Sequence, residues 1–472
     1  MTALPGDGLP APGSLVVVHG LGRFGGGREA VRFLARRGCR VRVADKSDGA
    51  DLQAVRLALR DAGDVDWQLG REDASLLDGA DWLLTNPAVP DQHPLLAAAA
   101  ARGVARTQEV DLFLAAYPGT VVAVTGTNGK STTSTLLHAA LRRAGRDALL
   151  GGNIGNSLLA EQANWQRDQI AVLEISSFQL ERLHAARRTA GAVFTRIGKD
   201  HVDRHGSLAA YHQAKARLAA IATDFVVHAA DDPVASAYAS PAQRRVRFAP
   251  TPPAPDCAGV DDGMVTVRLG AGPAVPIVHA AALRLLGEFQ LENVMAAAAA
   301  ARLVGADAHA VGLALANASP LPFRLQLVAV QDGVRVYDNG VSTEVESTRS
   351  ALQALTGRIH WVGGGKSKDG DYATMAAAVA PRIASAHLFG AAAEPLGALL
   401  QDRVPTTVHG PLAAALTAAF AAARPGDAVL FSPAFASFDQ YPNFRARALE
   451  FHGWLAARRD ADASLGAGGA GT

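Results

Sequence analysis

The sequence predicts an α/β protein of three domains, each with a parallel sheet covered by helices. Short runs of apolar, β-branched residues alternate with helical patterns along the chain, as is typical of parallel sheets. The length of 472 residues is too great for one ordinary core. We expect domains at residues 1–117, 118–319 and 320–472, with a glycine- and alanine-rich tail disordered from about residue 461.

The first domain opens with a β-α-β pattern. The expected elements are a strand at 15–18, a glycine-rich turn at 19–25, a helix at 28–38, and strands at 40–44 and 81–85. Glycines between a strand and a helix allow a tight turn and a close approach of the backbone to a phosphate. Tyr117-Pro118-Gly119 then punctuates the chain, so we place the first boundary there.

The second and third domains repeat this alternation. The second has expected strands at 121–124, 170–175, 192–195 and 225–228, a surface loop at 251–255 and a helix at 293–304. The third begins near residue 320 and has expected strands at 335–337, 359–362 and 428–431. The uninterrupted apolar run at 121–124 is typical of a buried parallel strand.

Composition limits the partners and the location. The formal net charge is +1, so charge gives no support for nucleic-acid or membrane binding. The two cysteines, Cys39 and Cys257, suit a reducing compartment better than a disulfide framework. The amino terminus lacks the pattern of a signal peptide, and no apolar run is long enough to cross a bilayer. We therefore expect a soluble, cytoplasmic monomer.

The strongest local motif is Gly126-Thr127-Asn128-Gly129-Lys130-Ser131-Thr132, between an expected strand and an expected helix. Backbone N–H groups of such a loop and of the helix N-terminus converge on phosphate oxygens. Lys130 would contact the terminal phosphates, and the Ser131 hydroxyl would bind Mg²⁺. Val124 replaces the first glycine of the usual phosphate loop. An ordinary turn is the alternative, and the flanking strand and helix favour nucleotide binding.

Three further positions carry charged or metal-ligating side chains. Glu174 ends an expected strand, where a carboxylate lies beside the phosphate loop and a cation can reach it; a solvated glutamate is the alternative. Asp200 and His201 share a short loop that could serve a second divalent ion or could be an exposed polar loop. Lys215 lies in an alanine-rich helical segment, where the default interpretation is a surface lysine.

Taken together, these segments resemble the Mur ligase family over nearly the whole chain. The matching segments, in the order and approximate spacing of the family, are GTNGKST, GNIG at 152–155, LEISSFQLE, DHVDR, GEFQLEN and SPAFASFDQY. SSFQLE and ASFDQ point to the members that add glutamate. The resemblance implies a Rossmann-like first domain that binds a uridine diphosphate precursor, a P-loop-type central ATPase domain with a parallel sheet, and a Rossmann-like third domain that brings the amino acid.

The implied activity is ATP-dependent, ADP-forming ligation of D-glutamate to UDP-N-acetylmuramoyl-L-alanine through an acyl phosphate, in peptidoglycan precursor synthesis. ATP and two Mg²⁺ ions are the implied cofactors. The implied metal ligands are Ser131, Glu174, His201 and Lys215, the lysine as a carbamate. The implied catalytic residues are Lys130, Glu174, His201 and Lys215.

The resemblance also implies three sets of binding residues. Those for ATP are 126–132, Asn293, Arg324 and Asn339. Those for the precursor are Arg23, Phe24, Asp45, Lys46, Asn86 and Asn153. Those for glutamate are Thr343, Lys366, Ser437 and Phe444. Phe24 would stack on uracil, and a core phenylalanine is its alternative.

The chain departs from the family pattern at several positions. Five residues differ from those that the family commonly has. Asn339 replaces an aspartate, Val341 replaces a lysine, Phe323 replaces a histidine, Gln290 replaces an asparagine and Ala88 replaces a glycine. These changes leave the phosphate and metal residues intact but bear on the ribose and glutamate contacts. Two alternatives therefore stay open: a ligase that uses L-glutamate or another acceptor such as a polyglutamyl folate, and a nucleotide-binding regulator without catalysis.

Overall fold

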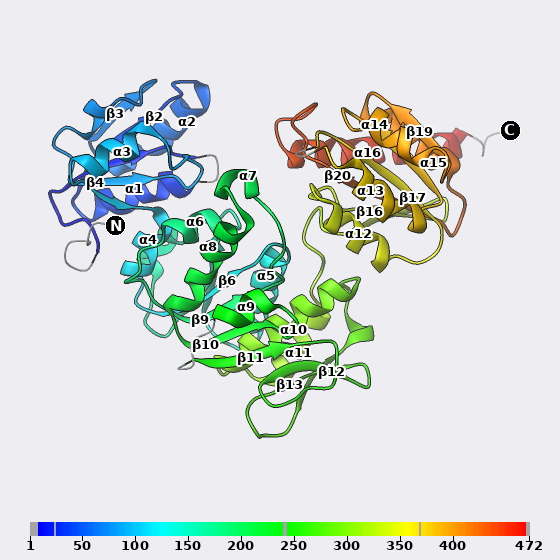
Figure 1. Ribbon diagram of the computed structural model, residues 1–472, viewed down its shortest axis with the longest axis horizontal. Helices are drawn as coiled ribbons and strands as arrows, with labels where there is room; N and C mark the ends of the chain where they lie inside the picture. The colour runs from blue at the N-terminus through cyan, green and yellow to red at the C-terminus, as the bar shows by residue number, and fades with distance from the viewer. Residues whose placement is uncertain (1–7, 23–24, 239–242, 368–369, 469–472) are drawn as a thin grey trace. The chain divides into compact units, whose positions relative to one another are not determined.

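The computed structural model describes residues 8–22, 25–238, 243–367 and 370–468 (Figure 1). It divides into two compact units. The first contains residues 1–283 and 292–317, and the second contains residues 284–291 and 318–472.

The first unit begins with the expected β-α-β pattern. Its strands are β1 (Leu15–His19), β2 (Arg40–Asp45), β3 (Val65–Leu69), β4 (Trp82–Thr85) and β5 (Ala105–Thr107). They form a parallel sheet in the order β3-β2-β1-β4-β5. Its helices are α1 (Gly26–Arg36), α2 (Ala50–Ala58), α3 (Pro94–Ala101) and α4 (Glu109–Ala116). Because β2 and β4 flank β1, the loops after these three strands meet at one edge of the sheet.

The same unit continues into a larger sheet in the order β14-β13-β12-β11-β10-β9-β6-β8-β7. Its strands are β6 (Thr120–Thr125), β7 (Ala148–Gly152), β8 (Ile170–Glu174), β9 (Thr189–Phe194), β10 (Ala222–Ala229), β11 (Arg244–Phe248), β12 (Cys257–Asp261), β13 (Met264–Arg268) and β14 (Val275–His279). Its helices are α5 (Lys130–Arg143), α6 (Ser177–Arg182), α7 (Val202–His205), α8 (Leu208–Ile221), α9 (Pro233–Tyr238), α11 (Ala308–Ala316) and, from residue 292 onward, α10 (Glu288–Leu303).

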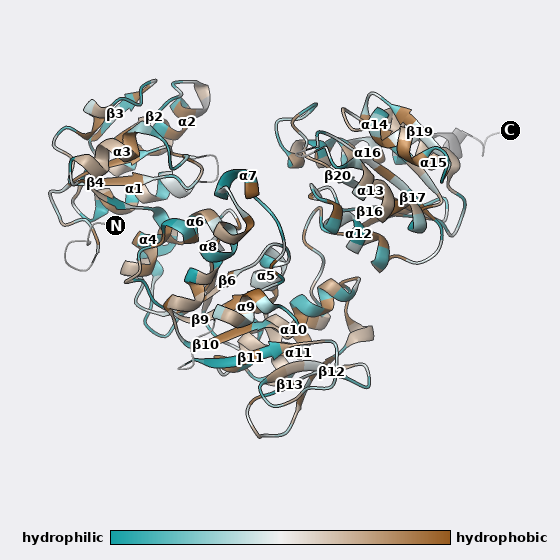
Figure 2. Ribbon diagram, viewed as in Figure 1, coloured by the Kyte–Doolittle hydropathy of each residue, from teal (hydrophilic) through white to brown (hydrophobic). Residues whose placement is uncertain are grey.

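The expectation of parallel pairing is confirmed for part of this sheet only. Strands β6 to β12 pair in parallel, whereas β12, β13 and β14 pair antiparallel. Only two residues separate β12 from β13, which suits a hairpin, whereas a parallel pair needs a longer crossover. Figure 2 shows the contrast in hydropathy between the apolar β4 and the arginine-rich β11.

One continuous apolar core runs through the first unit, from strands β1 and β4 to strands β6, β8 and β9. Trp165 lies at the junction, with ring centroids 5.6 Å from Phe113 and 5.4 Å from Tyr117. Both contacts are edge-to-face, the arrangement that aromatic rings prefer. This shared core explains why the first two expected domains form one compact unit.

The second unit has a sheet in the order β15-β16-β20-β17-β18-β19. Its strands are β15 (Gln326–Gln331), β16 (Val334–Asp338), β17 (Ile359–Gly364), β18 (Ser385–Phe389), β19 (Thr406–His409) and β20 (Ala428–Ala434). Its helices are α12 (Val345–Ala354), α13 (Tyr372–Val379), α14 (Ala393–Leu400), α15 (Leu412–Ala422) and α16 (Phe444–Gly468). All neighbours pair in parallel except β15, which forms an antiparallel hairpin with β16.

Helix α16 reaches Gly468, past residue 461 where the sequence analysis expects disorder to begin. The expectation of disorder therefore differs from the structure over residues 461–468, where three alanines and one leucine favour a helix and two glycines disfavour it. Among the residues that the structure describes, no helix is long and apolar enough to cross a membrane.

Candidate active site

The phosphate loop lies where the sequence predicts it, between β6 and α5. Gly129 is the N-cap of α5 and adopts a left-handed conformation, with φ of 84°. A Cβ at this position would collide with the side-chain oxygen of Asn293, so only glycine fits. Lys130 Nζ donates to the carbonyls of Gly126 and Thr127 at 3.0 and 2.7 Å. The loop thus joins a helix N-terminus and an ammonium group, which together bind phosphate.

Side chains from the neighbouring strand β9 and helix α8 brace this loop. Thr195 Oγ1 donates to the carbonyl of Asn128 at 2.5 Å. Thr127 Oγ1 accepts the backbone N–H of Gly198 at 2.8 Å and shares a hydrogen bond of 2.8 Å with the Tyr211 hydroxyl. The conformation of the loop is therefore fixed by contacts from outside it.

Glu174 ends β8, the strand beside β6, and is buried. Its Oε1 accepts a hydrogen bond of 2.9 Å from the side-chain amide of Asn153, in the loop after β7. Its Oε2 is buried and has no hydrogen-bond partner among the described residues. A buried carboxylate oxygen without a partner is costly, and a hard cation such as Mg²⁺ would supply the missing interaction. The alternative interpretation, a solvated glutamate, is wrong.

Lys215 is buried in α8, so the surface-lysine interpretation is wrong as well. Its Nζ donates to the carbonyl of Gly126 at 2.6 Å and lies 4.7 Å from the centre of the Tyr211 ring. Burial lowers the pKa of Lys215 well below its usual value, and the positive charge of Lys130 lowers it further, while the carboxylates of Asp200 and Glu174 act in the opposite direction. The site therefore favours a neutral amine.

His201 lies at the N-cap of α7 in a left-handed conformation, with φ of 50°. Its Nε2 is 3.2 Å from Asp200 Oδ2, and its backbone N–H donates to Asp200 Oδ1 at 2.8 Å. The Phe178 ring lies 4.8 Å from the His201 ring, between centroids. Asp200 and Phe178 thus fix the position of an exposed histidine that can bind a metal or a phosphate.

The precursor residues predicted in the first sheet lie after adjacent strands. Asp45, at the end of β2, accepts the backbone N–H of Leu21 at 3.1 Å and so holds the turn after β1. Lys46 is exposed beside it. Asn86, after β4, accepts the N–H of Ala88 at 2.9 Å. These residues therefore meet at the edge where the sheet topology places a nucleotide.

Two predicted precursor residues, Arg23 and Phe24, lie outside the described residues. They sit between Gly22 and Gly25, which both adopt positive φ values of 69° and 84°. The stacking role of Phe24 stays a prediction.

In the second unit, the loops that carry the predicted glutamate residues follow three adjacent strands, β16, β20 and β17. Lys366 pairs with Ala436 through backbone hydrogen bonds of 2.8 and 3.1 Å, which brings Lys366 next to Ser437. Thr343 follows β16, and Phe444 begins α16. The unit therefore gathers all four residues around the ends of three strands.

Family models match all three parts of the chain. Residues 14–107 match the Mur ligase MurD-like N-terminal domain, residues 124–301 the Mur ligase middle domain, and residues 323–435 the Mur ligase glutamate ligase domain. The UDP-N-acetylmuramoylalanine--D-glutamate ligase of Acidobacterium capsulatum is 36% identical over 455 residues, covering 96% of this chain and 98% of that protein. The chain belongs to the Mur ligase family.

Other Mur ligases resemble this one in sequence or in fold. The UDP-N-acetylmuramoylalanine--D-glutamate ligase of Geobacter metallireducens is 36% identical, covering 93% of this chain and 96% of that protein. The UDP-N-acetylmuramate-alanine ligase MurC of Thermotoga maritima has a TM-score of 0.59 at 17% identity, covering 94% and 99% of the two chains. The MurF ligase of the same organism, in complex with ADP, has a TM-score of 0.57 at 16% identity, covering 97% and 98%. Mur ligases are ATP-dependent, ADP-forming ligases, so the chain is an enzyme of this class.

The sequence analysis missed one residue of this Mur ligase that joins the glutamate loops. Arg447 is buried in α16, and its guanidinium donates to the carbonyls of Ser342 at 3.5 Å, Gly364 at 3.4 Å and Phe435 at 2.9 Å. These carbonyls precede Thr343, Lys366 and Ser437 by one or two positions. The available signal was an arginine at helical spacing from Phe444, within an otherwise apolar helix face.

The departures from the family pattern lie in the same region. Asn339 is buried, and its amide donates to Ser432 Oγ at 3.0 Å, inside the unit. Val341 donates its N–H to the carbonyl of Phe323 at 3.2 Å, and the Phe323 ring lies 6.5 Å from that of Phe444. Arg324 follows Phe323. The roles of Asn339 and Arg324 toward ATP, which the first unit would hold, stay predictions.

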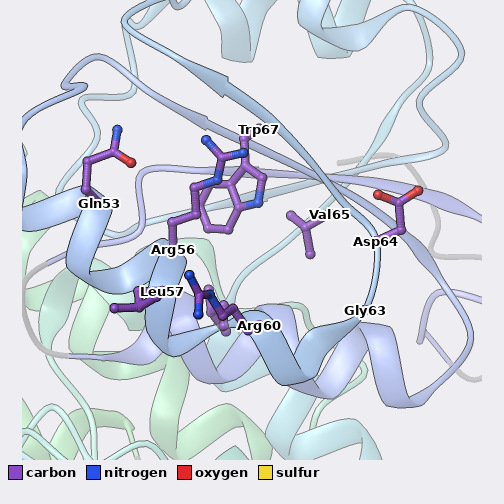
Figure 3. Close-up of a pocket in the computed structure, with 9 residues that line it drawn as sticks. Gln53, Arg56, Leu57, Arg60, Gly63, Asp64, Val65 and Trp67 are labelled. Carbon is purple, nitrogen blue, oxygen red and sulfur yellow. The ribbon is translucent and has the colours of Figure 1, made fainter.

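A pocket of about 530 Å³ in the first unit lies away from these residues (Figure 3). Arg56 lies over the Trp67 ring at 5.7 Å from its centre, and Arg60 and Asp64 also line the pocket. None of the predicted site residues lines it. Its walls come from α2 and β3, at the edge of the sheet opposite β5.

His19, Glu72 and His93 form a cluster whose ligand atoms lie within 4.8 Å of one another. Glu72 Oε1 is 2.9 Å from His19 Nε2, and Oε2 is 3.4 Å from His93 Nε2. His93 Nδ1 accepts the N–H of Leu95 at 3.2 Å, so the proton of a neutral ring is on Nε2, which then donates to Glu72 and has no lone pair for a metal. We interpret the cluster as a hydrogen-bonded support beneath the turn after β1.

Proposed function

We propose that this Mur ligase joins D-glutamate to UDP-N-acetylmuramoyl-L-alanine at the expense of ATP, in peptidoglycan precursor synthesis. The observation that carries the proposal is the hydrogen bond of 2.9 Å between Asn153 and Glu174. It joins a residue expected to contact the muramoyl-alanine group to a residue expected to bind the cation beside ATP. The carboxylate of the precursor would therefore lie next to the phosphate loop.

Phosphorylation of a carboxylate brings two anions together, and positive charge must screen both. Lys130 and the N-terminus of α5 supply that charge on the side of the phosphates. The terminal phosphate would pass to the precursor carboxylate with release of ADP, and the amine of glutamate would then displace phosphate to form the amide. Exclusion of water protects the acyl phosphate between these steps.

We propose that two Mg²⁺ ions take part. Ser131 and Glu174 would hold the first ion, and His201 with Lys215 as a carbamate the second. Bound Mg²⁺ would neutralise the developing charge on the transferred phosphoryl group. The orphaned Oε2 of Glu174 fits a cation, and the lowered pKa of buried Lys215 fits carbamate formation, which needs a neutral amine.

The glutamate site would use the residues gathered in the second unit. Lys366 offers a positive charge, and Thr343 and Ser437 offer hydroxyl groups, which suit the carboxylates of glutamate. Arg447 would fix the loops rather than touch the amino acid, because its donors already reach backbone carbonyls.

Use of L-glutamate is the second candidate function. The segment at 339–341 reads Asn-Gly-Val. The family has an aspartate at the position of Asn339 and a lysine at the position of Val341. Asn339 is directed to Ser432, so the segment presents no charged side chain at 339 or 341. A difference in charge beside the acceptor site is the kind of change that alters the choice of enantiomer.

An ADP-release assay with UDP-N-acetylmuramoyl-L-alanine and each glutamate enantiomer tests both candidates. We expect turnover with D-glutamate at least tenfold faster than with L-glutamate, the order of discrimination that a few changed contacts provide. The reverse preference would establish the second candidate. Absence of ADP release with any amino acid, and also with folylpolyglutamate in place of the muramoyl precursor, would support a regulator without catalysis.

We also propose a cytoplasmic, monomeric enzyme without nucleic-acid or membrane partners, since its substrates are soluble nucleotides and its net charge is near zero. The domain boundaries after residues 117 and 319 are part of the same proposal. Limited proteolysis at these positions tests them.

A further inference from the structure

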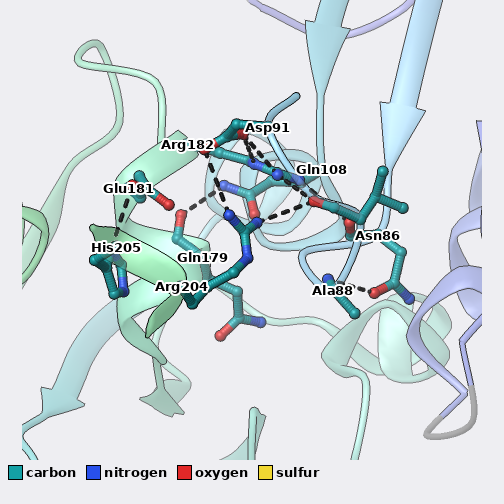
Figure 4. Close-up of polar contacts among 10 residues, drawn as sticks. Asn86, Ala88, Asp91, Gln108, Gln179, Glu181, Arg182, Arg204 and His205 are labelled. Carbon is teal, nitrogen blue, oxygen red and sulfur yellow. Dashed lines mark hydrogen bonds and ion pairs between the residues drawn. The ribbon is translucent and has the colours of Figure 1, made fainter. Parts of the chain in front are cut away.

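Two arginines from the central part of the first unit hold the loop that follows β4 (Figure 4). Arg182, the last residue of α6, donates to the carbonyl of Asn86 at 3.3 Å and to the carbonyl of Val89. Its Nε also donates to Asp91 Oδ1 at 2.9 Å. Arg204, in α7, donates to the carbonyl of Val89 at 3.0 Å. One guanidinium therefore contacts both ends of the loop at 86–91, and a second one reinforces its middle.

These contacts are more than a surface ion pair. The Arg182 side chain is 9% exposed and that of Arg204 is 19% exposed, whereas Asp91 is 39% exposed. An arginine removed from water needs hydrogen-bond acceptors for its fixed fork of N–H groups, and the loop carbonyls supply them. If the loop moved away, Arg182 would lose two carbonyls and a carboxylate together. The conformation of the loop is therefore coupled to a nearly buried charge.

On the loop side, Arg182 reaches the expected precursor site through Asn86. The Asn86 side chain packs so closely on the turn after β1 that a Cβ at Gly22 would collide with its amide group, and a Cβ at Gly20 would lie 3.2 Å from the Asn86 Cβ. The carbonyl of Asn86 is the group that Arg182 holds. A shift of the loop would therefore move Asn86 against the turn.

On the other side, Arg182 belongs to the segment that carries the metal residues. Helix α6 begins with a capping box in which Ser176, two residues after Glu174, bonds to Gln179. The ring of His205 in α7 hydrogen-bonds to Ser177 Oγ at 3.0 Å, which ties α7 to α6. The two arginines thus project from two short helices, α6 and α7, that form a rigid pair. This pair of helices adjoins Glu174 and His201.

We propose that Arg182, supported by Arg204, is a positioning residue that sets the loop at 86–91 for binding of the nucleotide-linked precursor. Arg182 would act through Asn86 rather than by contact with substrate or ATP, because its donors already reach Asn86, Val89 and Asp91. The inference rests on the proposed function, because it takes the precursor to bind at the turn after β1. It adds a link between that turn and the helices beside the phosphate loop.

The test is direct binding of UDP-N-acetylmuramoyl-L-alanine and, separately, of an unhydrolysable ATP analogue, measured by calorimetry on the full chain. We expect the loop in Arg182→Ala to adopt its binding conformation about a tenth of the time. The Kd for the precursor should therefore rise about tenfold. The Kd for the ATP analogue should stay within about twofold. Arg182→Lys keeps the charge but loses the fork, so we expect a smaller rise of about threefold to fivefold.

Arg188→Ala is the matched control. Arg188 is an exposed arginine six positions further on, and its side chain donates only to Ala185 and Arg187 carbonyls of its own segment. Its removal should change neither Kd. Asp91→Ala provides a second route if Arg182→Ala fails to fold, since Asp91 is at the surface. We expect Asp91→Ala to raise the precursor Kd about twofold to threefold, and to add nothing in an Arg182→Ala background.

Three results would overturn the inference. The first is an unchanged precursor Kd in Arg182→Ala, or in Asp91→Ala where the arginine variant does not fold. The second is an equal loss of precursor and ATP-analogue binding, which a general structural role predicts. The third is a wild-type protein that does not bind the precursor, and this result alone also removes the proposed function.

Discussion

The side-chain amide of Asn153 donates to Glu174 Oε1 at 2.9 Å, and the second carboxylate oxygen of Glu174 is left buried without a partner among the described residues. One oxygen is thus fixed by a loop of the proposed precursor site, and the other is available to a cation. A buried, half-satisfied carboxylate is unfavourable in the folded protein on its own. We therefore expect function rather than stability to require it.

Glu174→Gln tests this trade-off. The amide keeps the contact with Asn153 but removes the negative charge, so kcat should fall by about 10²–10³, the usual cost of one missing electrostatic group in a transition state. The Tm should stay the same or rise, because a buried charge has been removed. Thermal unfolding with and without MgCl₂ and ATP analogue provides a second measurement. The ligands should raise the Tm of the wild type more than that of the variant, and a clear drop in the ligand-free Tm would contradict the prediction.

Lys215 and Lys130 should respond in opposite ways to an added carboxylate. Lys215→Ala should lose most activity, and acetate should restore part of it, because a carbamate at this buried position would act as an anionic oxygen ligand. Lys130→Ala should also lose activity, by about 10²–10³, but acetate should not help, because that position needs a cation. Steady-state kinetics at increasing acetate concentration measures both. Full activity of Lys215→Ala, or acetate rescue of Lys130→Ala alone, would contradict these roles.

The phosphate loop, and the strand and helix on either side of it, could be predicted because local sequence determines them. GTNGKST lies between an apolar strand and a helix, and the structure has β6 and α5 there. The burial of Lys215 could not be read from an alanine-rich helix, since the face that α8 turns inward depends on its packing against α6 and β6. Composition alone favoured a surface lysine.

Other features depend on contacts between distant segments. The antiparallel strands β12 to β14 are short, and their hairpin pairing does not show in the alternation of strands and helices. Arg447 is joined to loops 12, 83 and 105 residues away in sequence, so its role is visible only when the sheet is formed. The same holds for Arg182, whose partner Asp91 is 91 residues away.

Arg447 should govern the affinity for glutamate without contacting it. Arg447→Lys keeps a positive charge but cannot reach three carbonyls in one plane, so the loops of Thr343, Lys366 and Ser437 should lose their common anchor. We expect the KM for glutamate to rise about tenfold or more and the KM for ATP to change less than threefold. Ser437→Ala should raise the KM for glutamate in the same selective way. Equal effects on both KM values would place Arg447 among residues of general structural importance.

The second unit should lose stability as the pH falls below neutrality, because of a buried histidine. His387 in β18 hydrogen-bonds to Ser385 Oγ at 2.7 Å and to Thr407 Oγ1 at 2.9 Å. Ser385 in turn bonds to His360, and His360 to Asp427, which continues the chain of hydrogen bonds across the sheet. Burial first, and then the nearby His360 and His409, lower the pKa of His387 from 6.5 to about 4.

The sign of the effect follows from which state binds the proton. Between pH 6.5 and about 4 the unfolded chain protonates His387 and the folded chain does not, so unfolding becomes more favourable as the pH falls. The contribution of His387 to the free energy of unfolding is therefore fully present above pH 6.5. It falls by about 1.36 kcal/mol for each pH unit, so that about 3 kcal/mol of stability is lost by pH 4. At Asp427 burial raises the pKa, but the hydrogen bonds from His360 and the Arg424 backbone, together with the nearby His360 and Arg358, outweigh burial and lower the pKa below 3.8, so this carboxylate loses its contribution only at lower pH.

His387→Gln should reduce this pH dependence, since glutamine can hydrogen-bond to the same hydroxyl groups but does not titrate. Urea unfolding followed between pH 7 and pH 4 should show a shallower fall in the free energy of unfolding for the variant than for the wild type. His409→Gln is the matched control, because His409 is a more exposed histidine at the end of the same chain and bonds to Thr407 at 2.9 Å. The control should retain most of the wild-type slope, because burial, and not the neighbouring His409, is the largest cause of the lowered pKa of His387. If the free energy of unfolding falls equally steeply with pH in His387→Gln and in the wild type, His387 does not cause the loss of stability. Carboxylates and other histidines of the chain would then cause it.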